Sequence, residues 1–248
     1  MKYKNLVLIK QKGFNVPEFL SIPEDIEFNA LGEVFEWFNR IEEAPFITRS
    51  SFSMEDGVNR SFAGVFESYY PIYTWEDFMK WYNICINSYK SSKFRSYTEA
   101  HKLEILDSVS KNVILQKYIV WDVSWVCFSQ YNEKYIYIEC VPWINGPFVN
   151  GEYLSPFTIS IERRNLNKIR VISFFENDFF YTIQDGTIEK VYGNTQFYME
   201  DYFLPYIKDL WEICKELQSI FLYPQDIEFT IYKWKIYILQ SRNVTVVI

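Results

Sequence analysis

The feature that most constrains this chain is the alternation of apolar and polar residues over positions 227–244. The alternation contains a turn signal near Lys233-Trp234-Lys235. A period of two on either side of a turn signal predicts two β-strands joined by a tight turn. Residues two apart on a strand share a face, so Gln240 and Arg242 are expected to point the same way. The alternating apolar positions are Ile227, Phe229, Ile231, Ile236, Ile238 and Val244.

This predicted hairpin brings together side chains that suit a metal ion and a phosphate. Glu228 on the first strand can come opposite the face that carries Gln240 and Arg242. Mg²⁺ prefers oxygen ligands such as the carboxylate and the amide oxygen, and a planar guanidinium suits a phosphate. The alternative interpretation is an ordinary amphipathic hairpin with a polar outer face.

A second polar motif follows the predicted strand that begins at Phe46. The strand runs into Arg49 and a hydroxyl-rich turn, and a second extended segment returns through Phe62-Ala63-Gly64. Small residues such as Gly64 allow backbone N–H groups to approach a phosphate chain closely. The guanidinium of Arg49 can bind two phosphate oxygens at once. The motif therefore predicts a phosphate-binding loop.

Both motifs resemble those of a known family. The segments P-Q-D-I-E-F…Y-I-L-Q-S-R and R-S-S-F-S-M-E-D…S-F-A-G-V-F-E-S are similar to motifs in the ATP-binding domain shared by phosphoenolpyruvate synthase, pyruvate phosphate dikinase and rifampicin phosphotransferase. That domain is an ATP-grasp relative. The resemblance implies that Glu228 and Gln240 hold Mg²⁺ on ATP and that Arg242 contacts the phosphates. Arg49 and Arg242 are the implied catalytic residues, with Gly64 in the phosphate loop and Ser68 in the place of a threonine.

The resemblance extends to the N-terminus and to a buried strand near the middle of the chain. Aligned on Asn5-Leu6 and Gly13-Phe14, the family's ATP-binding lysine falls on Lys2, with Lys4 as a competitor. The apolar run over 112–120 is consistent with a central strand. In the family this strand meets the adenine with backbone groups. The residues carried over are Gln116, Lys117 beside it, and the main chain through Ile119.

The expected fold is α+β, with two lobes of ATP-grasp type and ATP between them. The expected lobes are residues 1–110, with the Arg49 and Gly64 loops, and residues 111–248, with the metal-binding hairpin. Helical periodicity predicts helices over 2–12 (ended by Gly13), within 20–45, over 74–110 and over 199–221. Strands are expected between 157 and 192, with a turn at Asp185-Gly186.

Composition excludes several classes of protein. A net charge of −7 argues against a nucleic-acid binder that works through a broad basic field. The four cysteines are scattered and there is one histidine, so neither a disulfide framework nor a zinc site is indicated. No apolar run approaches the roughly 20 residues that span a bilayer. Lys10 and Lys12 interrupt the N-terminal apolar patch, which indicates a cytoplasmic protein without a signal peptide.

The sequence supports two functional hypotheses. The first is an ATP-dependent phosphotransferase that acts on an unknown acceptor, supplied by a separate phosphohistidine protein or a small molecule. The second is a non-catalytic nucleotide-binding or interaction protein that has lost turnover. The intact Arg49 and hairpin motif favour the first, and the degenerate glycine-rich turn at Trp143–Gly146 favours the second. His101 lies in a polar segment without the family's carrier motif and is not expected to carry phosphate.

Overall fold

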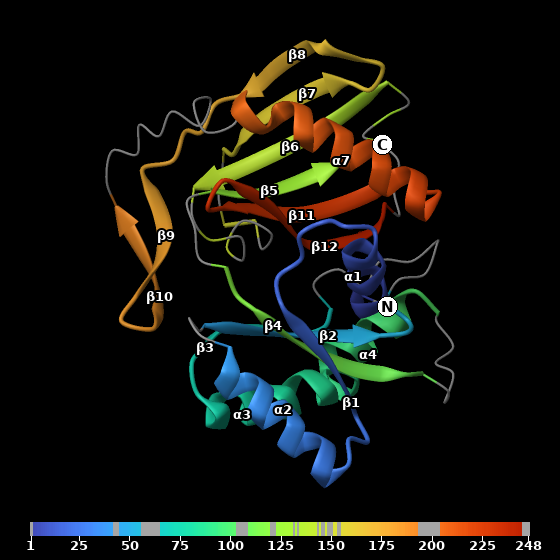
Figure 1. Ribbon diagram of the computed structural model, residues 1–248, viewed down its shortest axis with the longest axis vertical. Coiled ribbons are helices and arrows are strands. Elements are labelled where there is room, and N and C mark those ends of the chain that lie inside the picture. The colour runs from blue at the N-terminus through green and yellow to red at the C-terminus, as the bar shows by residue number, and fades with distance from the viewer. Residues whose placement is uncertain are drawn as a thin grey trace. The chain divides into compact units, whose positions relative to one another are not determined.

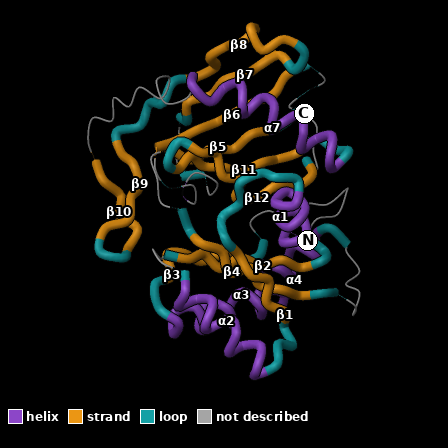
Figure 2. Tube along the Cα trace, viewed as in Figure 1, coloured by secondary structure: helices purple, strands orange, loops and turns teal. Residues whose placement is uncertain are grey.

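A computed structural model describes residues 2–41, 45–55, 65–102, 109–119, 123–130, 132, 134–142, 144, 147, 151–152, 155–192 and 204–244. The chain divides into two compact units. The first comprises Met1–Lys4 and Pro17–Ile119, and the second comprises Asn5–Val16 and Val120–Ile248. The predicted division near residue 110 differs from this one, because the strand that follows it pairs within the first unit. Figure 1 labels the elements, and Figure 2 shows that both units combine helices with sheets, as the α+β class requires.

The first unit is built on a four-stranded antiparallel sheet in the order β1-β4-β2-β3. Its strands are β1 (Phe19–Pro23), β2 (Phe46–Phe52), β3 (Ser68–Ile72) and β4 (Lys111–Lys117). β4 lies between β1 and β2, which explains its nearly continuous apolar sequence. The predicted central strand is confirmed.

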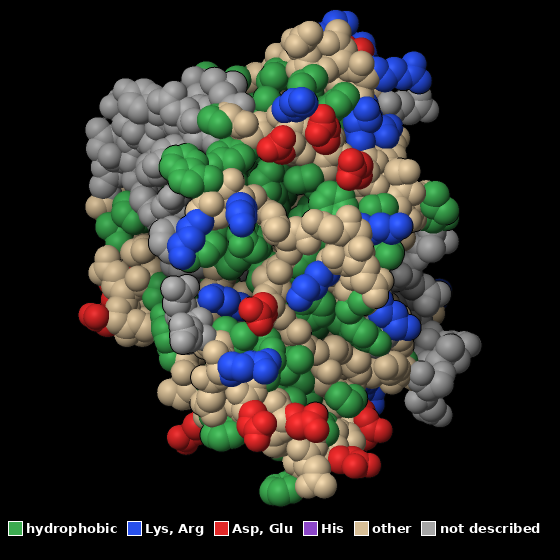
Figure 3. All heavy atoms as spheres, in the orientation of Figure 1, with side chains coloured by type: hydrophobic (Ala, Val, Ile, Leu, Met, Phe, Trp, Pro, Cys, Tyr) green, Lys and Arg blue, Asp and Glu red, His purple; other side chains and the backbone are tan. Residues whose placement is uncertain are grey.

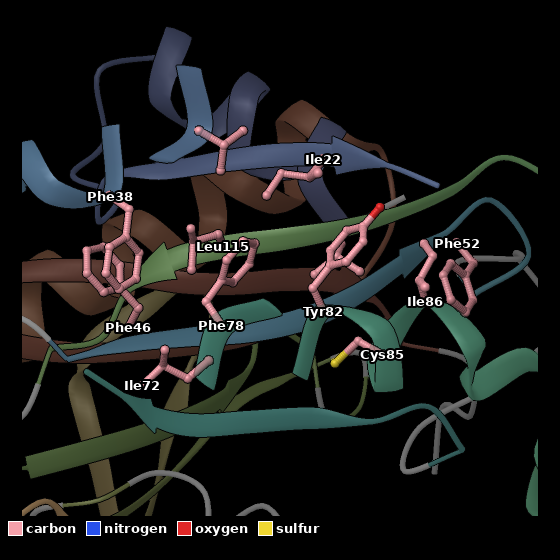
Figure 4. Packing of buried hydrophobic residues seen from close by; sticks show 12 residues of the cluster. Ile22, Phe38, Phe46, Phe52, Ile72, Phe78, Tyr82, Cys85, Ile86 and Leu115 are labelled. Atoms are coloured by element: carbon pink, nitrogen blue, oxygen red, sulfur yellow. The ribbon is translucent and has the colours of Figure 1, made fainter. Parts of the chain in front are cut away.

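The described part of the first unit also contains the helices α2 (Phe28–Arg40), α3 (Trp75–Asn87) and α4 (Ser92–Ala100), with a short 3₁₀ helix, η1 (Ser88–Lys90). Thr74 and Ser91 cap α3 and α4 by accepting hydrogen bonds from backbone N–H groups in the first turn. Figure 4 shows apolar side chains of α2 and α3 packing on those of the sheet. Phe38 stacks on Phe46 with ring centroids 4.6 Å apart.

The N-terminal helix α1 (Lys2–Gln11) ends where the sequence predicts. Gly13 has a φ of +91°, and its N–H donates to the carbonyl of Lys10 while that of Phe14 donates to the carbonyl of Ile9. This pair of hydrogen bonds is a Schellman motif, which favours glycine because of the left-handed backbone. The buried residues of α1 are Leu6 and Ile9.

The second unit contains a six-stranded antiparallel sheet in the order β12-β11-β5-β6-β7-β8. Helix α7 (Ile207–Phe221), preceded by η2 (Leu204–Tyr206), crosses one face of this sheet (Figure 1). Cys214 of α7 contacts Cys127 of β5, with the two sulfur atoms 2.8 Å apart. The strands are β5 (Val123–Phe128), β6 (Tyr135–Pro142), β7 (Phe157–Glu162), β8 (Asn165–Ser173), β11 (Gln225–Tyr232) and β12 (Lys235–Asn243).

A separate hairpin, β9 (Phe179–Gln184) and β10 (Thr187–Tyr192), turns at Asp185-Gly186 as predicted. The predicted turn of the C-terminal hairpin is also confirmed, at Lys233-Trp234. Trp125 of β5 is fully buried and stacks on Phe229 of β11. On the face of the molecule in Figure 3, basic and acidic side chains are mixed in the upper and middle parts, and acidic side chains gather at the lower end.

Two local expectations need correction. The hydroxyl-rich turn predicted after Arg49 is strand up to Phe52, because β2 pairs with β4 through Ser51 and Asn112. The predicted helix over 74–110 is interrupted: α3 and α4 are separated by η1, and residues 109–110 are not helical. The predicted extended segment Phe62-Ala63-Gly64 lies outside the described residues.

Candidate functional site

The C-terminal hairpin places Glu228 directly opposite Gln240. The two residues are register partners in the β11–β12 pair, and Gln240 Nε2 donates to Glu228 Oε1 over 3.1 Å. Gln240 is almost fully buried. The predicted meeting of a carboxylate and an amide on one face of this hairpin is therefore confirmed by the geometry.

A β-bulge makes this arrangement compatible with the apolar core. Ile238 and Gln240 are two residues apart and would share a face of a regular strand. Phe229 pairs with Ile238 and Glu228 pairs with Gln240, so Leu239 is an extra residue in β12. Ile238 consequently lies with Phe229 on the face covered by α7, while Gln240 lies on the opposite face.

Next to this pair, Arg242 is held by Asp226, a residue that the sequence analysis did not single out. Arg242 Nε and Nη2 both donate to Asp226 Oδ2, over 2.8 and 2.6 Å. Burial raises the pKa of Asp226 and the Arg242 charge opposes that rise, while Glu228 adds to it. Asp226 Oδ1 is buried and has no hydrogen-bond partner among the described residues. The sequence signal that could have identified Asp226 is its spacing of two residues from Glu228, which places both side chains on one face of the strand.

The reverse face of the hairpin is fixed by a network of buried amides and hydroxyls. Gln225 Oε1 accepts from Ser241 Oγ over 2.8 Å, and its Nε2 donates to Asn243 Oδ1 over 2.8 Å. The backbone N–H of Gln225 donates to Ser129 Oγ over 2.7 Å. Since Gln225 adjoins Asp226 and Ser241 adjoins Arg242, these bonds fix the end of the hairpin that carries the ion pair.

A third carboxylate lies on the same face of the sheet. Val126 is the register partner of both Glu228 and Glu139, so the two glutamates lie on either side of it. They are two strand spacings apart, which is about 10 Å. Burial raises the pKa of Glu139, and no hydrogen bond or ion pair joins its side chain to another described residue. Glu139 is therefore a further site candidate, which the sequence motifs above do not include.

In the first unit, Arg49, Ser68 and Gln116 share one face of the sheet. Arg49 pairs with Ser68 across β2–β3. Gln116 pairs with Ile47, which lies two residues from Arg49 on β2. Phe46 and Thr48 point to the other face, toward α2 and α3. The sheet therefore brings these three predicted residues together. Gln116 is 1% exposed, and its Nε2 has no hydrogen-bond partner among the described residues.

Tyr118 joins this group and was missed by the sequence analysis. It follows Gln116 by two residues, and its ring stacks on that of Tyr70 with centroids 4.7 Å apart. Burial raises the pKa of Tyr118 well above its usual value, Tyr70 raises it further, and the nearby Arg49 charge opposes the rise. The phenol of Tyr118, stacked on Tyr70, therefore lies near the Arg49 guanidinium.

Lys2 is anchored in the first unit, whereas its competitor Lys4 is exposed. Lys2 Nζ forms an ion pair with Glu55 and donates to the carbonyl oxygen of Ser50 over 3.0 Å. Its side chain is 17% exposed and that of Glu55 is 4% exposed. Glu55 Oε1 also accepts from the backbone N–H of Phe52, so the lysine is tied to the end of β2 that follows Arg49.

The remaining predicted residues lie less close to these groups or cannot be located. Lys117 pairs with Phe46 and therefore starts on the opposite face of the sheet from Gln116. Ile119 follows β4 and is half-buried. Gly64 and most of the Trp143–Gly146 turn lie outside the described residues. His101 is exposed at the end of α4, where its Nδ1 lies 2.9 Å from the Tyr97 carbonyl oxygen.

The hairpin residues fit a magnesium ion that is shared with a phosphate ligand. Among the described residues no three His, Cys, Asp or Glu side chains form a metal cluster. Mg²⁺ commonly uses only one or two carboxylates and completes its shell with phosphates and water. Glu228 and the unbonded Oδ1 of Asp226 supply carboxylate oxygens on one face, and Gln240 adds an amide oxygen.

Comparison with known proteins identifies the class to which this site belongs. Residues 17–247 match the family model described as "Pyruvate phosphate dikinase, AMP/ATP-binding domain". The chain therefore belongs to this family of nucleotide-binding domains. The resemblance inferred from the two sequence motifs is confirmed.

Two curated relatives are similar over 80% of this chain. The uncharacterized phosphotransferase YvkC of Bacillus subtilis (strain 168) is 27% identical over 206 residues, and a probable phosphoenolpyruvate synthase of Archaeoglobus fulgidus is 28% identical over 207 residues. The matched parts are 24% and 27% of those proteins, so the chain spans about a quarter of their length.

Solved structures of D-alanine–D-alanine ligases also align with the chain. The Helicobacter pylori enzyme aligns with 97% of this chain and 53% of its own, at a TM-score of 0.42 and 10% identity. The Bacillus anthracis enzyme gives a TM-score of 0.40 at 9% identity.

Among the described residues, no helix is long and apolar enough to cross a membrane.

Proposed function

We propose that this chain binds ATP with Mg²⁺ and serves as the nucleotide-binding part of a phosphotransferase. The observation that carries the proposal is the hairpin face on which Glu228 opposes Gln240 and Asp226 holds Arg242. Membership of an AMP/ATP-binding family supports the nucleotide. The names of the two relatives, a phosphotransferase and a probable phosphoenolpyruvate synthase, support phosphoryl transfer.

In the second unit we assign the metal to Glu228 and Gln240 and a phosphate contact to Arg242. Mg²⁺ would neutralise charge on the phosphates there. The bond from Asp226 fixes the plane of the Arg242 guanidinium, so less freedom is lost when it meets phosphate oxygens. The bulge at Leu239 keeps the site face polar while the neighbouring strand residue remains in the core.

In the first unit we assign a second phosphate contact to Arg49, supported by Ser68 and Lys2. Arg49 and Ser68 are register partners, and Lys2 is bonded to Ser50, the next residue of β2. The buried amide of Gln116 and the main chain through Ile119 are proposed to meet the adenine. Gly64 and Lys117 remain proposed contacts on the family pattern alone.

A second function is favoured by one specific observation. The glycine-rich turn at Trp143–Gly146 departs from the family pattern, which supports a chain that binds nucleotide without turnover. If turnover exists, its acceptor is proposed to be a separate histidine-bearing protein or a small molecule, and the protein is proposed to be cytoplasmic. The two functions share the nucleotide site and differ only in whether the bound nucleotide is turned over.

The deciding experiment is calorimetric titration of ATP, ADP and GTP with and without Mg²⁺ on the wild type and Glu228→Gln. Glu228→Gln keeps the side-chain shape and an acceptor for Gln240 but removes the charge. We expect Mg²⁺ to strengthen ATP binding to the wild type and to have little effect on Glu228→Gln, with equal apo melting temperatures. Glu216→Gln, an exposed position on α7, is the matched control. A variant with unchanged Mg²⁺ dependence would contradict the metal assignment.

A further inference from the structure

Apart from the hairpin face, the second unit contains a cavity of about 320 Å³ that no part of the proposed mechanism uses. It lies between the loop after α1, the start of α7 and the β11–β12 turn. Phe14, Tyr206 and Trp234 provide three aromatic rings, Ile213 adds an aliphatic surface, and Asp209 and Lys235 also line it. This volume is at the small end of the range for ligand pockets, about 300–1,000 Å³.

Trp234 adopts a backbone conformation in the β11–β12 turn that its residue type does not prefer. Lys233 and Trp234 have φ angles of 46° and 64°, in the left-handed region that favours Asn and Gly in such turns. Neither residue is the type that this backbone prefers. Trp234 is nevertheless 86% exposed beside the cavity, so its burial in the unit's own core does not explain it. Strained backbone of this kind is found at ligand-binding sites more often than elsewhere.

The loop on the other side of the cavity is fixed by hydrogen bonds. The N–H of Ile238 donates to the carbonyl oxygen of Asn15 over 2.9 Å, and Asn15 Nδ2 donates to the carbonyl oxygen of Ile236 over 3.1 Å. These bonds add the loop to the outer edge of β12. Phe14 is therefore held next to the strand that leads from Trp234, and the cavity has a preformed wall.

The cavity is lined by one negative and one positive side chain that do not form an ion pair with each other. Among the described residues neither Asp209 nor Lys235 forms an ion pair or a side-chain hydrogen bond. Burial raises the pKa of Tyr206, so its phenol stays protonated and can donate a hydrogen bond. A polyphosphate would meet Asp209 and a simple cation would meet Lys235, so a ligand with both charges suits the cavity best.

We propose that this cavity binds a small zwitterion with a flat apolar group, an aromatic α-amino acid. In this arrangement Asp209 accepts from the ammonium group, Lys235 and Tyr206 bind the carboxylate, and the ring lies among Phe14, Trp234 and Ile213. Aromatic pairs and charge-assisted hydrogen bonds then provide the affinity. The site is independent of the ATP site, so neither proposal depends on the other.

The test is calorimetric titration of the whole chain with L-phenylalanine, phenethylamine and 3-phenylpropionate. The last two compounds each lack one of the two charges. We expect saturable binding of L-phenylalanine, and binding of each analogue to be at least about tenfold weaker because one charge-assisted hydrogen bond is lost. Equal binding of either analogue, or no binding of L-phenylalanine up to its solubility limit, would overturn the proposal.

Variants locate the site by matched pairs. Asp209→Asn, Lys235→Met and Trp234→Ala should each weaken L-phenylalanine binding by about tenfold or more. Glu212→Gln on α7, Lys233→Met in the same turn and Leu222→Ala, an exposed residue that also has a positive φ, do not line the cavity and should bind as the wild type does. Glu228→Gln should also bind L-phenylalanine normally. A loss in the controls equal to that in the cavity variants would place the binding elsewhere and overturn the assignment.

Discussion

Gln240 donates a hydrogen bond to Glu228 across the β11–β12 hairpin, and this contact makes the pair sensitive to charge. Gln240→Glu would place two carboxylates in contact at a position that is almost fully buried. Without metal, we expect the melting temperature at pH 7 to fall by several degrees, since about 1 kcal/mol corresponds to ~2–4 °C in a chain of this size. Mg²⁺ should restore more of the melting temperature in this variant than it adds to the wild type.

Thermal unfolding of both proteins with and without Mg²⁺ checks this prediction. Gln218→Glu is unsuitable as a control because Gln218 belongs to the network with Ser129 and Arg163. Gln184→Glu, at the exposed end of β9, changes the same residue type away from the hairpin. If Mg²⁺ stabilises Gln240→Glu no more than it stabilises this control, the two side chains do not share a metal.

The two arginines should respond alike to loss of the planar guanidinium. Arg49→Lys and Arg242→Lys each keep the charge but remove the two-pronged donor, so we expect each to lose about 1–3 kcal/mol of ATP affinity. Arg242→Lys also loses the paired bonds to Asp226, which should lower its melting temperature more than that of Arg49→Lys. Arg95→Lys on the exposed side of α4 is the control for titrations. Unchanged ATP binding by both variants would mean that neither arginine contacts a phosphate.

Because of the half-buried Glu139, we expect the stability of the protein to decrease as the pH rises above the pKa of an unfolded glutamate. Burial raises its pKa above 4.5, so the folded protein retains the proton at pH values where the unfolded chain has released it. The contribution of this group to stability therefore falls as the pH rises from about 4.5 through the raised pKa. Glu139→Gln removes that loss. We expect the melting temperature of the nucleotide-free variant to be higher than that of the wild type at pH 7 and equal to it at pH 4.

Denaturant or thermal unfolding at both pH values gives the measurement. A variant that is less stable than the wild type at pH 7 would show that the Glu139 carboxylate is paired in the folded protein. The same variant should bind ATP more weakly if the carboxylate faces the nucleotide. A gain in stability combined with a loss of binding would indicate a residue kept for function at the expense of stability.

The period of two accounts for most of what the sequence predicts about the site. It places Glu228, Gln240 and Arg242 at a hairpin, and it groups Arg49 with its neighbours on one face of β2. The bulge at Leu239 was not predicted, although a regular strand would place the polar Gln240 on the same face as the apolar Ile238. The position of the extra residue depends on how β12 pairs with β11, and this pairing is set by the tertiary structure.

Residues whose roles depend on long-range contacts were missed for the same reason. Tyr118 is separated by 48 positions from Tyr70, and only strand pairing in the first unit brings their rings together. The division of the chain after Ile119 follows from the pairing of β4 with β1 and β2, which its apolar sequence does not reveal. Asp226 was visible in the motif, but its bond to Arg242 depends on the register of the hairpin.

The last prediction concerns phosphoryl transfer to the chain itself. Transfer needs an acceptor in line with the γ-phosphate and held close to it. His101 is the only histidine in the chain, and it caps the end of α4, where its ring stacks on that of Tyr97 with centroids 4.2 Å apart. Its Nδ1 is engaged by the carbonyl oxygen of Tyr97. We therefore expect ATP·Mg²⁺ to be bound and hydrolysed slowly, without labelling of His101.

Incubation with ATP labelled at the β- or γ-phosphate, followed by mass spectrometry of the intact chain, tests this expectation. Wild type and His101→Ala should give the same unmodified mass, and turnover should rise only when a histidine-bearing protein or a small nucleophile is added. Phosphorylation of the wild type that is absent from His101→Ala would make the chain a self-contained phosphohistidine enzyme. That result would also require α4 to approach the nucleotide, because in-line transfer is effective only when the reacting atoms are held about 3–3.5 Å apart.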